Sequence, residues 1–202
     1  MKITAIKAQV KNQERVSIYI DGKYDFSLDQ GQLLSARLYV GRELTEEELA
    51  QLKDESAFGK ALGRALDYIM RRPRSIKEMH DYAWRKQWEP MMRDRVIARL
   101  TEKGYLDDAK FADTWVRHRA MGKPISERKL RMELKQKGVA EDIINATLEK
   151  DEEFDESEAL KRLIEKKRAR YPDEQKFIAY LLRQGYRYDD IRLALDERSN
   201  GS

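Results

Sequence analysis

The sequence of 202 residues contains no cysteine, only two histidines and no apolar run near the length of a membrane-spanning helix, which is about 18 residues. Without cysteine the chain forms no disulfide and has no thiolate chemistry, which suits a reducing compartment. The first residues also lack the apolar segment of a secretory signal. We therefore expect a soluble, cytoplasmic protein without a membrane contact.

The residues that carry enzyme chemistry are scarce. His80 and His118 are far apart in the sequence, whereas a zinc site needs about four clustered ligands. The ten glycines are scattered, so no phosphate-binding loop can be identified. The acidic pairs Asp107-Asp108 and Asp189-Asp190 stand where helices are expected to begin, which favours capping over magnesium binding. We expect no enzymatic activity, no metal and no cofactor.

A pattern of a capping residue followed by two apolar residues at helical spacing occurs three times. The three sets are Ser75, Met79 and Ala83; Ser126, Leu130 and Leu134; and Asp173, Phe177 and Leu181. They are separated by 51 and 47 residues, and each is followed by another apolar segment. A period near 50 residues indicates a repeat architecture. The sequence therefore predicts a mainly α protein in which three tandem three-helix repeats form an elongated, curved array.

The middle repeat shows the pattern most clearly. Asp107 or Asp108 can cap its first helix, because a short carboxylate accepts bonds from the unpaired N–H groups of a helix start. Phe111, Trp115 and His118 then fall on one face of that helix. We expect this stripe to be buried.

The first residues predict a small antiparallel sheet. Apolar residues alternate over 6–10, 16–20 and 24–28, with turn signals between them. A three-residue loop at 21–23 would pair Ile20 with Tyr24 and Ile18 with Phe26, which keeps both apolar sets on one face. We therefore expect a bulged hairpin with its extra residue in the loop.

The chain is expected to divide into four segments, with the first boundary near Lys53–Ser56, where the composition turns polar. These are 1–55, a β-hairpin with short helices capped by Asp29 and Thr45; 56–103, repeat one; 104–153, repeat two; and 154–202, repeat three with a loose tail from Arg198. The acidic residues after Lys150 could form a disordered linker, but the spacing of the apolar residues behind them favours a long charged helix.

Positive charge is concentrated in the first two repeats. Residues 56–103 carry 12 basic and 6 acidic side chains, which favours an anionic partner. The candidate contact residues lie near the end of the first helix of each repeat: Arg64, Arg71, Arg72 and Arg74; Arg117, Arg119, Lys123, Arg128, Lys129 and Arg131; and Lys166, Lys167, Arg168 and Arg170. For any single residue, an ordinary solvated helix face is the alternative.

The tryptophans differ in their expected roles. Trp115 lies on the predicted buried stripe. Trp84 falls beside the inner edge of a helix that is expected to carry Trp88 as well. It is equally compatible with burial and with an exposed contact for a partner.

The chain resembles the RecX proteins, regulators of the RecA recombinase, over about residues 57–197. The resemblance rests on Gly104-Tyr105-Leu106-Asp107-Asp108, Phe111-Ala112, Trp115-Val116, Arg119, Glu133-Leu134 and Lys137-Gly138 in the middle repeat, with Arg72-Pro73-Arg74-Ser75 and Glu78-Met79 before it and Phe177, Tyr180-Leu181, Arg183 and Gly185-Tyr186 after it. One departure is Gln87-Trp88, where a Lys-Gly-like helix end would be usual. The strand-bearing N-terminal part is similar to that of longer members.

This resemblance implies binding rather than catalysis. A RecX-like protein would bind RecA and the RecA–DNA filament and inhibit ATP hydrolysis, strand exchange and coprotease activity, thereby regulating recombination, DNA repair and the SOS response. We expect such a protein to be a monomer, with at most weak contact to single- or double-stranded DNA. The alternatives are a sequence-independent DNA-binding repeat protein that acts without recombinase and a repeat scaffold for another partner.

Overall fold

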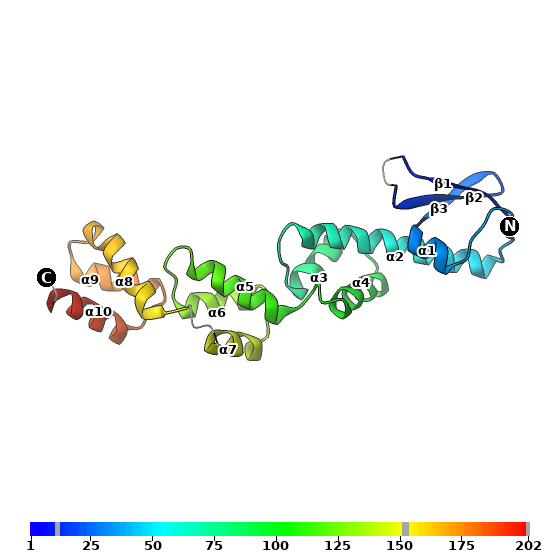
Figure 1. Ribbon diagram of the computed structural model, residues 1–202. Coiled ribbons are helices and arrows are strands. Elements are labelled where there is room, and N and C mark those ends of the chain that lie inside the picture. The colour runs from blue at the N-terminus through cyan, green and yellow to red at the C-terminus, as the bar shows by residue number, and fades with distance from the viewer. Residues whose placement is uncertain (11–12, 151–153, 201–202) are drawn as a thin grey trace. The chain divides into compact units, whose positions relative to one another are not determined.

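The computed structural model describes residues 1–10, 13–150 and 154–200 (Figure 1). These residues form three strands, ten α-helices and one short 3-10 helix, so the fold is mainly helical, as predicted. They pack as two compact units. Unit one comprises Met1–Arg72 and Trp88–Ala98; unit two comprises Pro73–Gln87 and the described residues of Arg99–Ser202. Within the described residues, no helix combines the length and apolar character needed to cross a membrane.

The chain begins with the predicted antiparallel sheet. Strands β1 (Ile3–Ala8), β2 (Arg15–Ile20) and β3 (Lys23–Asp29) are adjacent in that order (Figure 1). The prediction that Val10 belongs to the first strand is wrong, because Val10 lies beyond β1 and is 97% exposed. The strand begins earlier, since the Ile3 backbone pairs with Gly41 and Arg42 and its side chain is fully buried.

The hairpin between β2 and β3 is bulged, but the bulge lies inside a strand. Ile18 pairs with Phe26 as predicted, whereas Ile20 pairs with Lys23 and not with Tyr24. The turn residues Asp21 and Gly22 both have positive φ angles, 48° and 82°, which suits a two-residue hairpin turn. The register then shifts after Ile18, which returns the apolar side chains to one face.

Two helices follow with the predicted caps. Asp29 caps α1 (Gln30–Ser35) and Thr45 caps α2 (Glu46–Met70), each with a reciprocal bond from the third helical residue. Helix α2 runs without interruption through Lys53–Ser56, where the sequence predicts the first domain boundary. The buried Ser56 hydroxyl donates to the Ser27 carbonyl oxygen at 2.6 Å, so this polar residue anchors α2 to the sheet and does not start a helix.

The acidic residues of the same stretch also have a partner in unit one. Helix α4 spans Pro90–Glu102, and its Arg95 binds Asp54 at 2.6 Å and also Glu55. The guanidinium lies 4.1 Å from the centre of the Phe58 ring. The acidic residues around position 54 therefore contribute to the contact of α2 with α4.

Four helices of unit two begin at the predicted caps Ser75, Asp107, Ser126 and Asp173, and a fifth begins at Asp155, which was not predicted as a cap. Each of these five side chains accepts a backbone N–H bond at the start of its helix. The predicted capping pair Asp189-Asp190 lies instead within the first turn of its helix. The elements are α3 (Ile76–Arg85), α5 (Asp108–Ala120), α6 (Glu127–Gln136), α7 (Glu141–Lys150), α8 (Glu156–Lys167), η1 (Arg168–Arg170), α9 (Glu174–Arg183) and α10 (Tyr188–Asn200).

The bundle of α5, α6 and α7 has a compact apolar core. Phe111, Ala112 and Val116 of α5 are buried among residues of α6 and α7. Trp115 stacks on Phe111 at the margin of the core, with the ring centres 5.8 Å apart. The prediction that His118 continues the buried stripe is wrong, because the stripe passes through Ala112 and Val116 and leaves His118 exposed.

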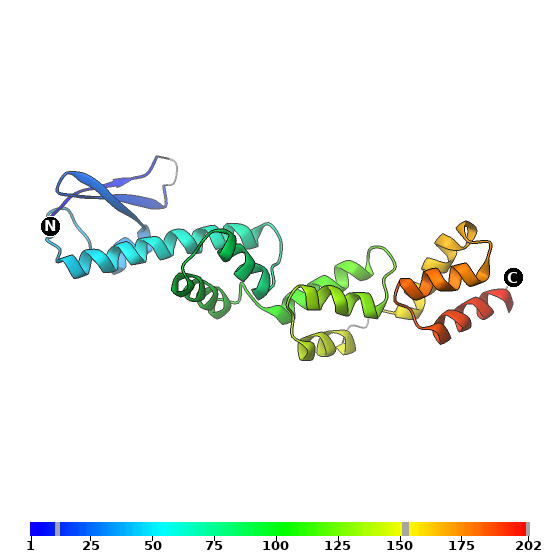
Figure 2. The same ribbon diagram turned by 180° about the vertical axis from the view of Figure 1, so that it is seen from behind.

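The bundle of α8, α9 and α10, coloured from yellow to red in Figure 2, buries Leu160, Ile164, Phe177, Leu181 and Ile191. Helix α10 continues to Asn200, through the start of the tail that the sequence predicts to be loose from Arg198; residues 201–202 lie outside the described residues. Part of the predicted long charged helix, 151–153, also lies outside them, and α8 begins only at Glu156.

The turn after α3 accommodates the departure at Gln87-Trp88. Gly138 after α6 and Gly185 after α9 have φ angles of 80° and 97°, and Gln87 adopts the same left-handed conformation at 54°. The local geometry is therefore kept without glycine, at a cost of about 1–2 kcal/mol for a residue with a Cβ. Trp88 lies beyond the end of α3 and so does not share that helix with Trp84, contrary to the prediction.

Two buried serines connect successive repeats within unit two. Ser75 accepts the N–H of Glu78 at 3.1 Å and donates its hydroxyl to the Lys137 carbonyl at 2.6 Å, where α6 ends. This contact is here called the first joint. In the second joint, Ser126 accepts the N–H of Lys129 at 3.3 Å and donates to the Gln184 carbonyl at 2.8 Å, where α9 ends. Each serine thus serves the start of one helix and the end of another.

A carboxylate completes each joint. The N–H of Ile76 donates to Asp108 at 2.8 Å, and the N–H of Glu127 donates to Glu156 at 2.9 Å. Partial burial raises the pKa of both carboxyl groups, and the N–H bond opposes this change. Asp107 caps its own helix, so the two neighbouring aspartates have different partners.

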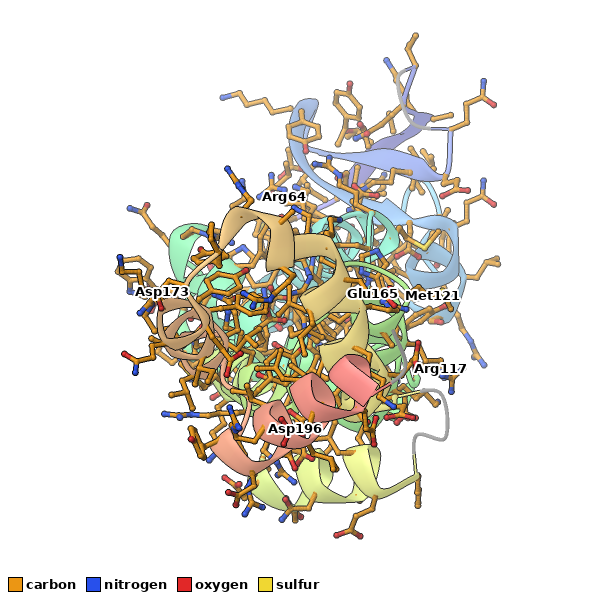
Figure 3. The ribbon with its side chains drawn as sticks, turned by 90° about the vertical axis from the view of Figure 1, so that its left-hand side faces the viewer. Arg64, Arg117, Met121, Glu165, Asp173 and Asp196 are labelled. Atoms are coloured by element: carbon orange, nitrogen blue, oxygen red, sulfur yellow. The ribbon has the colours of Figure 1, made fainter. Side chains whose placement is uncertain are left out.

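The left-handed glycines allow the helix ends to approach closely. A Cβ on Gly138 would lie 2.5 Å from the Cβ of Lys77, and one on Gly185 would lie 2.5 Å from the Ser126 hydroxyl. Asp173 is the corresponding residue of the third repeat, and it lies at the exposed start of α9 (Figure 3). A carboxylate accepts but cannot donate, so Asp173 cannot repeat the bond that Ser75 and Ser126 make.

Replacing Phe111 by alanine should lower the free energy of unfolding by about 3–5 kcal/mol, because a buried ring is lost and leaves a cavity. Urea denaturation followed by circular dichroism measures the change. His118→Ala, on the exposed side of the same helix, is the control and should remain close to the wild type. Equal stability of the Phe111 variant and the wild type would show that the ring is not part of the core.

Replacing Ser126 by alanine should destabilise the chain more than Asp173→Ala. Both variants lose a helix cap, which costs about 1 kcal/mol, but Ser126→Ala also leaves the Gln184 carbonyl without its donor, which adds about 1–3 kcal/mol. Urea denaturation of the two variants measures the difference. Equal losses would mean that the bond across the second joint contributes nothing.

Candidate partner-binding surface

The predicted basic residues near the end of α2 are presented to solvent to different extents. Arg64 lies on α2, and Arg71 and Arg72 follow its last residue; all three side chains are exposed. Arg74 is half-buried immediately before the Ser75 cap. This segment ends where Pro73 disfavours helix in the residue before it.

The predicted basic residues of the second repeat fall into two groups. Arg119 makes two bonds of 3.0 Å to Glu133, which also accepts the indole N–H of Trp115 at 2.9 Å. Arg131 binds Glu127 at 2.7 Å and Asn145 at 2.5 Å. These two arginines therefore connect the helices of the bundle, and their charges are largely compensated.

The other basic residues of the second repeat face solvent. Arg117 is exposed near the end of α5 (Figure 3), and Lys123 is exposed in the turn before α6. Arg128 is exposed in the first turn of α6, and Lys129 beside it donates to the Gln184 side-chain oxygen at 2.5 Å. Arg117, Lys123 and Arg128 are therefore available to an external partner more readily than Arg119 and Arg131, whereas Lys129 is half-buried and bound.

In the third repeat, Lys166 and Arg170 are exposed and Lys167 is half-buried. Arg168 donates to the Tyr171 carbonyl at 2.5 Å and lies 5.5 Å from the centre of the Phe177 ring. Its guanidinium therefore covers the core of the third bundle. Some of the recurring cations are thus exposed and remain candidates for a partner contact, whereas others bind groups of their own bundle.

Trp84 is 79% exposed on α3. A large aromatic side chain left in water is a typical anchor for a protein partner. Its exposure resolves the choice between a buried and an exposed position, while its contact role remains a prediction.

A groove of about 530 Å³ lies across the second joint, between α6 and α9. Arg128, Lys129 and Met132 line it from α6, and Leu182 and Arg183 line it from α9. Met132 is 52% and Leu182 is 41% exposed. Sequence reasoning did not predict Met132, Leu182 or Arg183 as contact residues, although comparison of equivalent repeat positions would reveal that two apolar side chains replace charged ones there.

The structure also bears on metal binding. Across the described ranges, no three histidine, aspartate or glutamate side chains are grouped in a way that could hold a metal ion. Of the acidic pairs considered for magnesium, Asp107 and Asp108 accept backbone N–H bonds at helix starts. What the geometry offers is a set of exposed cations, an exposed indole and a groove.

Three family models match the chain. They are the regulatory protein RecX N-terminal domain over residues 1–45, the first RecX three-helix domain over 61–100 and the second over 107–148. The two three-helix matches fall on two of the repeats predicted from the sequence.

Curated relatives and solved structures agree with these matches. The chain is 32% identical to the regulatory protein RecX of Listeria welshimeri, over 99% of this chain and 77% of the relative, and 33% identical to that of Bacillus pumilus, over 98% and 78%. A crystal structure of regulatory protein RecX covers 96% of this chain and 98% of its own, with 28% identity and a TM-score of 0.81. The RecX structure from Lactobacillus salivarius, at 22% identity and a TM-score of 0.60 over 69% of this chain, supports the fold. The chain therefore belongs to the RecX family of regulatory proteins.

Proposed function

We propose that this protein binds the RecA–DNA filament and inhibits its ATPase, strand-exchange and coprotease activities, and so regulates recombination, DNA repair and the SOS response. Membership of a family of regulatory proteins supports this proposal. The repeated joint also supports the proposal, because two equivalent hydrogen-bonded contacts hold successive repeats one after another within unit two. A filament likewise presents equivalent sites in series.

Binding by several repeats explains a preference for filament over free recombinase. Each repeat needs only a weak contact, because the first contact raises the effective concentration of the next one. The exposed cations, Arg71, Arg117, Arg128 and Lys166, lie on or beside successive repeats and would complement an acidic protein surface or phosphate groups. Such binding requires no bond-making chemistry by this chain.

Direct binding to DNA is the second candidate function, because three-helix units of this size can bind a duplex and the chain has a net charge of +4. Phosphate binding releases counterions, so its affinity falls steeply with salt. A salt titration with naked DNA and no recombinase tests this alternative. We expect weak and sequence-independent binding.

The proposal is tested by co-sedimentation with RecA that is assembled on single-stranded DNA and with RecA that is not, with ATPase activity followed in parallel. Binding to the assembled form at lower protein concentrations, together with loss of ATPase activity, is the expected result. Absence of binding to either form would refute the proposed function and would leave a scaffold for another partner.

Replacing Arg71, Arg72 and Arg74 together with alanine should weaken filament inhibition without unfolding, because none of the three side chains is part of the buried core. The half-inhibitory concentration in the ATPase assay measures the effect, and circular dichroism checks the fold. Lys23→Ala, Lys103→Ala and Lys150→Ala combined remove the same charge from exposed positions elsewhere. Equal effects of the two triple variants would mean that overall charge matters and that this segment is no contact surface.

A further inference from the structure

The first and second joints are built alike, yet their surfaces differ. Residues of α3 correspond to residues of α6 that lie 51 positions later, and residues of α6 correspond to residues of α9 that lie 47 positions later. At the first joint, Lys77 pairs with Asp81 at 2.9 Å and Lys137 pairs with Glu78 at 2.7 Å. Lys135 pairs with Glu141 at 2.5 Å. The surface of the first joint is therefore neutralised by its own side chains.

At the second joint, the same positions carry different side chains. Met132 stands where the first joint has Asp81, and Leu182 stands where it has Lys135. Without an aspartate at position 132, Arg128 lacks the partner that Lys77 has. The joint geometry is kept, but two paired charges are replaced by exposed apolar groups in the groove of about 530 Å³.

The groove is positive as well as apolar. Neither Arg128 nor Arg183 forms an ion pair with any residue in the described part of the chain. Lys129 is held by the neutral side chain of Gln184. The single carboxylate in the lining, Glu133, is already bound by Arg119 and Trp115. A ligand therefore meets cations whose charges are not compensated.

We infer that the groove between α6 and α9 binds an acidic peptide segment of the protein partner that carries an apolar side chain between its carboxylates. The apolar side chain would occupy the space between Met132 and Leu182, and the carboxylates would pair with Arg128 and Arg183. The inference rests on the proposed function, in which the segment belongs to the recombinase filament.

The groove suits a protein segment better than nucleic acid. Two apolar side chains in its lining gain from covering by another apolar group, whereas a phosphate backbone offers none. The described residues that line the groove include no aromatic ring on which a base could stack.

The decisive variant gives the second joint the surface of the first. Met132→Asp combined with Leu182→Lys removes the apolar groups, and the new aspartate lies four residues after Arg128, as Asp81 lies four residues after Lys77. Both positions are partly in water, so the fold should tolerate the change. The matched control is the reverse exchange at the first joint, Asp81→Met with Lys135→Leu.

Binding of each variant to preassembled RecA on single-stranded DNA, and to the same DNA alone, is measured by co-sedimentation. The groove variant should bind the filament about tenfold more weakly or worse, as expected when an anchor is lost, and the control should bind like the wild type. Filament binding of the groove variant equal to that of the wild type overturns the inference. A parallel loss of affinity for DNA alone also overturns it, because the groove would then be a nucleic-acid site.

A second measurement does not depend on the recombinase. In the full chain labelled at its methionine methyl groups, a peptide of alternating glutamate and leucine should shift the NMR signal of Met132, and a peptide of alternating lysine and leucine should not. If the glutamate–leucine peptide shifts the Met132 signal but the wild type does not bind the filament, the proposed function is refuted and the groove is still a site for acidic peptides. Equal shifts with both peptides, or none with either, would overturn the groove assignment.

Discussion

A buried serine hydroxyl that accepts one hydrogen bond and donates another is the interaction on which unit two depends. Ser75 and Ser126 each take an N–H from the helix that they begin and give their own hydrogen to the carbonyl that ends another helix. A hydroxyl group can do both at once, whereas a carboxylate only accepts. Because the bond is made at the ends of helices and left-handed glycines bring the backbones close, the repeats are fixed to one another by few atoms.

Local signals in the sequence were sufficient to predict the repeat and the helix starts at Ser75, Asp107, Ser126 and Asp173, since a cap and the helix that it begins are neighbours in the chain. The joints were not predictable in the same way. The acceptors at Lys137 and Gln184 are backbone carbonyls far along the sequence, and no side chain marks them. The position of the β-bulge has a similar explanation, because apolar alternation requires an extra residue but does not say whether the loop or the strand contains it.

The sequence predicted that the candidate contact surface is basic, but it did not show which basic residues are free to meet a partner. Arg119, Arg128 and Arg131 look alike in the sequence, yet the first and last are bound by carboxylates of their own bundle while Arg128 faces the groove. Ion pairs between helices depend on three-dimensional neighbours, so charge counting cannot separate such residues. Met132 and Leu182 illustrate the converse, because an exposed apolar residue on a helix face has the same spacing as a buried one.

The joints also bring the dipoles of successive helices together, with the positive end of one beside the negative end of the next. The N-terminus of a helix carries a partial positive charge and its C-terminus a partial negative charge, each about half an elementary charge. Since the start of α3 meets the end of α6, and the start of α6 meets the end of α9, opposite poles are adjacent at both joints. Two poles are left over, and each has a side chain of the opposite sign: Asp173 at the start of α9 and Lys86 at the end of α3. Opposite poles thus face each other inside the series of second helices, and the two outer poles face charges of the opposite sign, to which Glu174 and Arg85 also contribute.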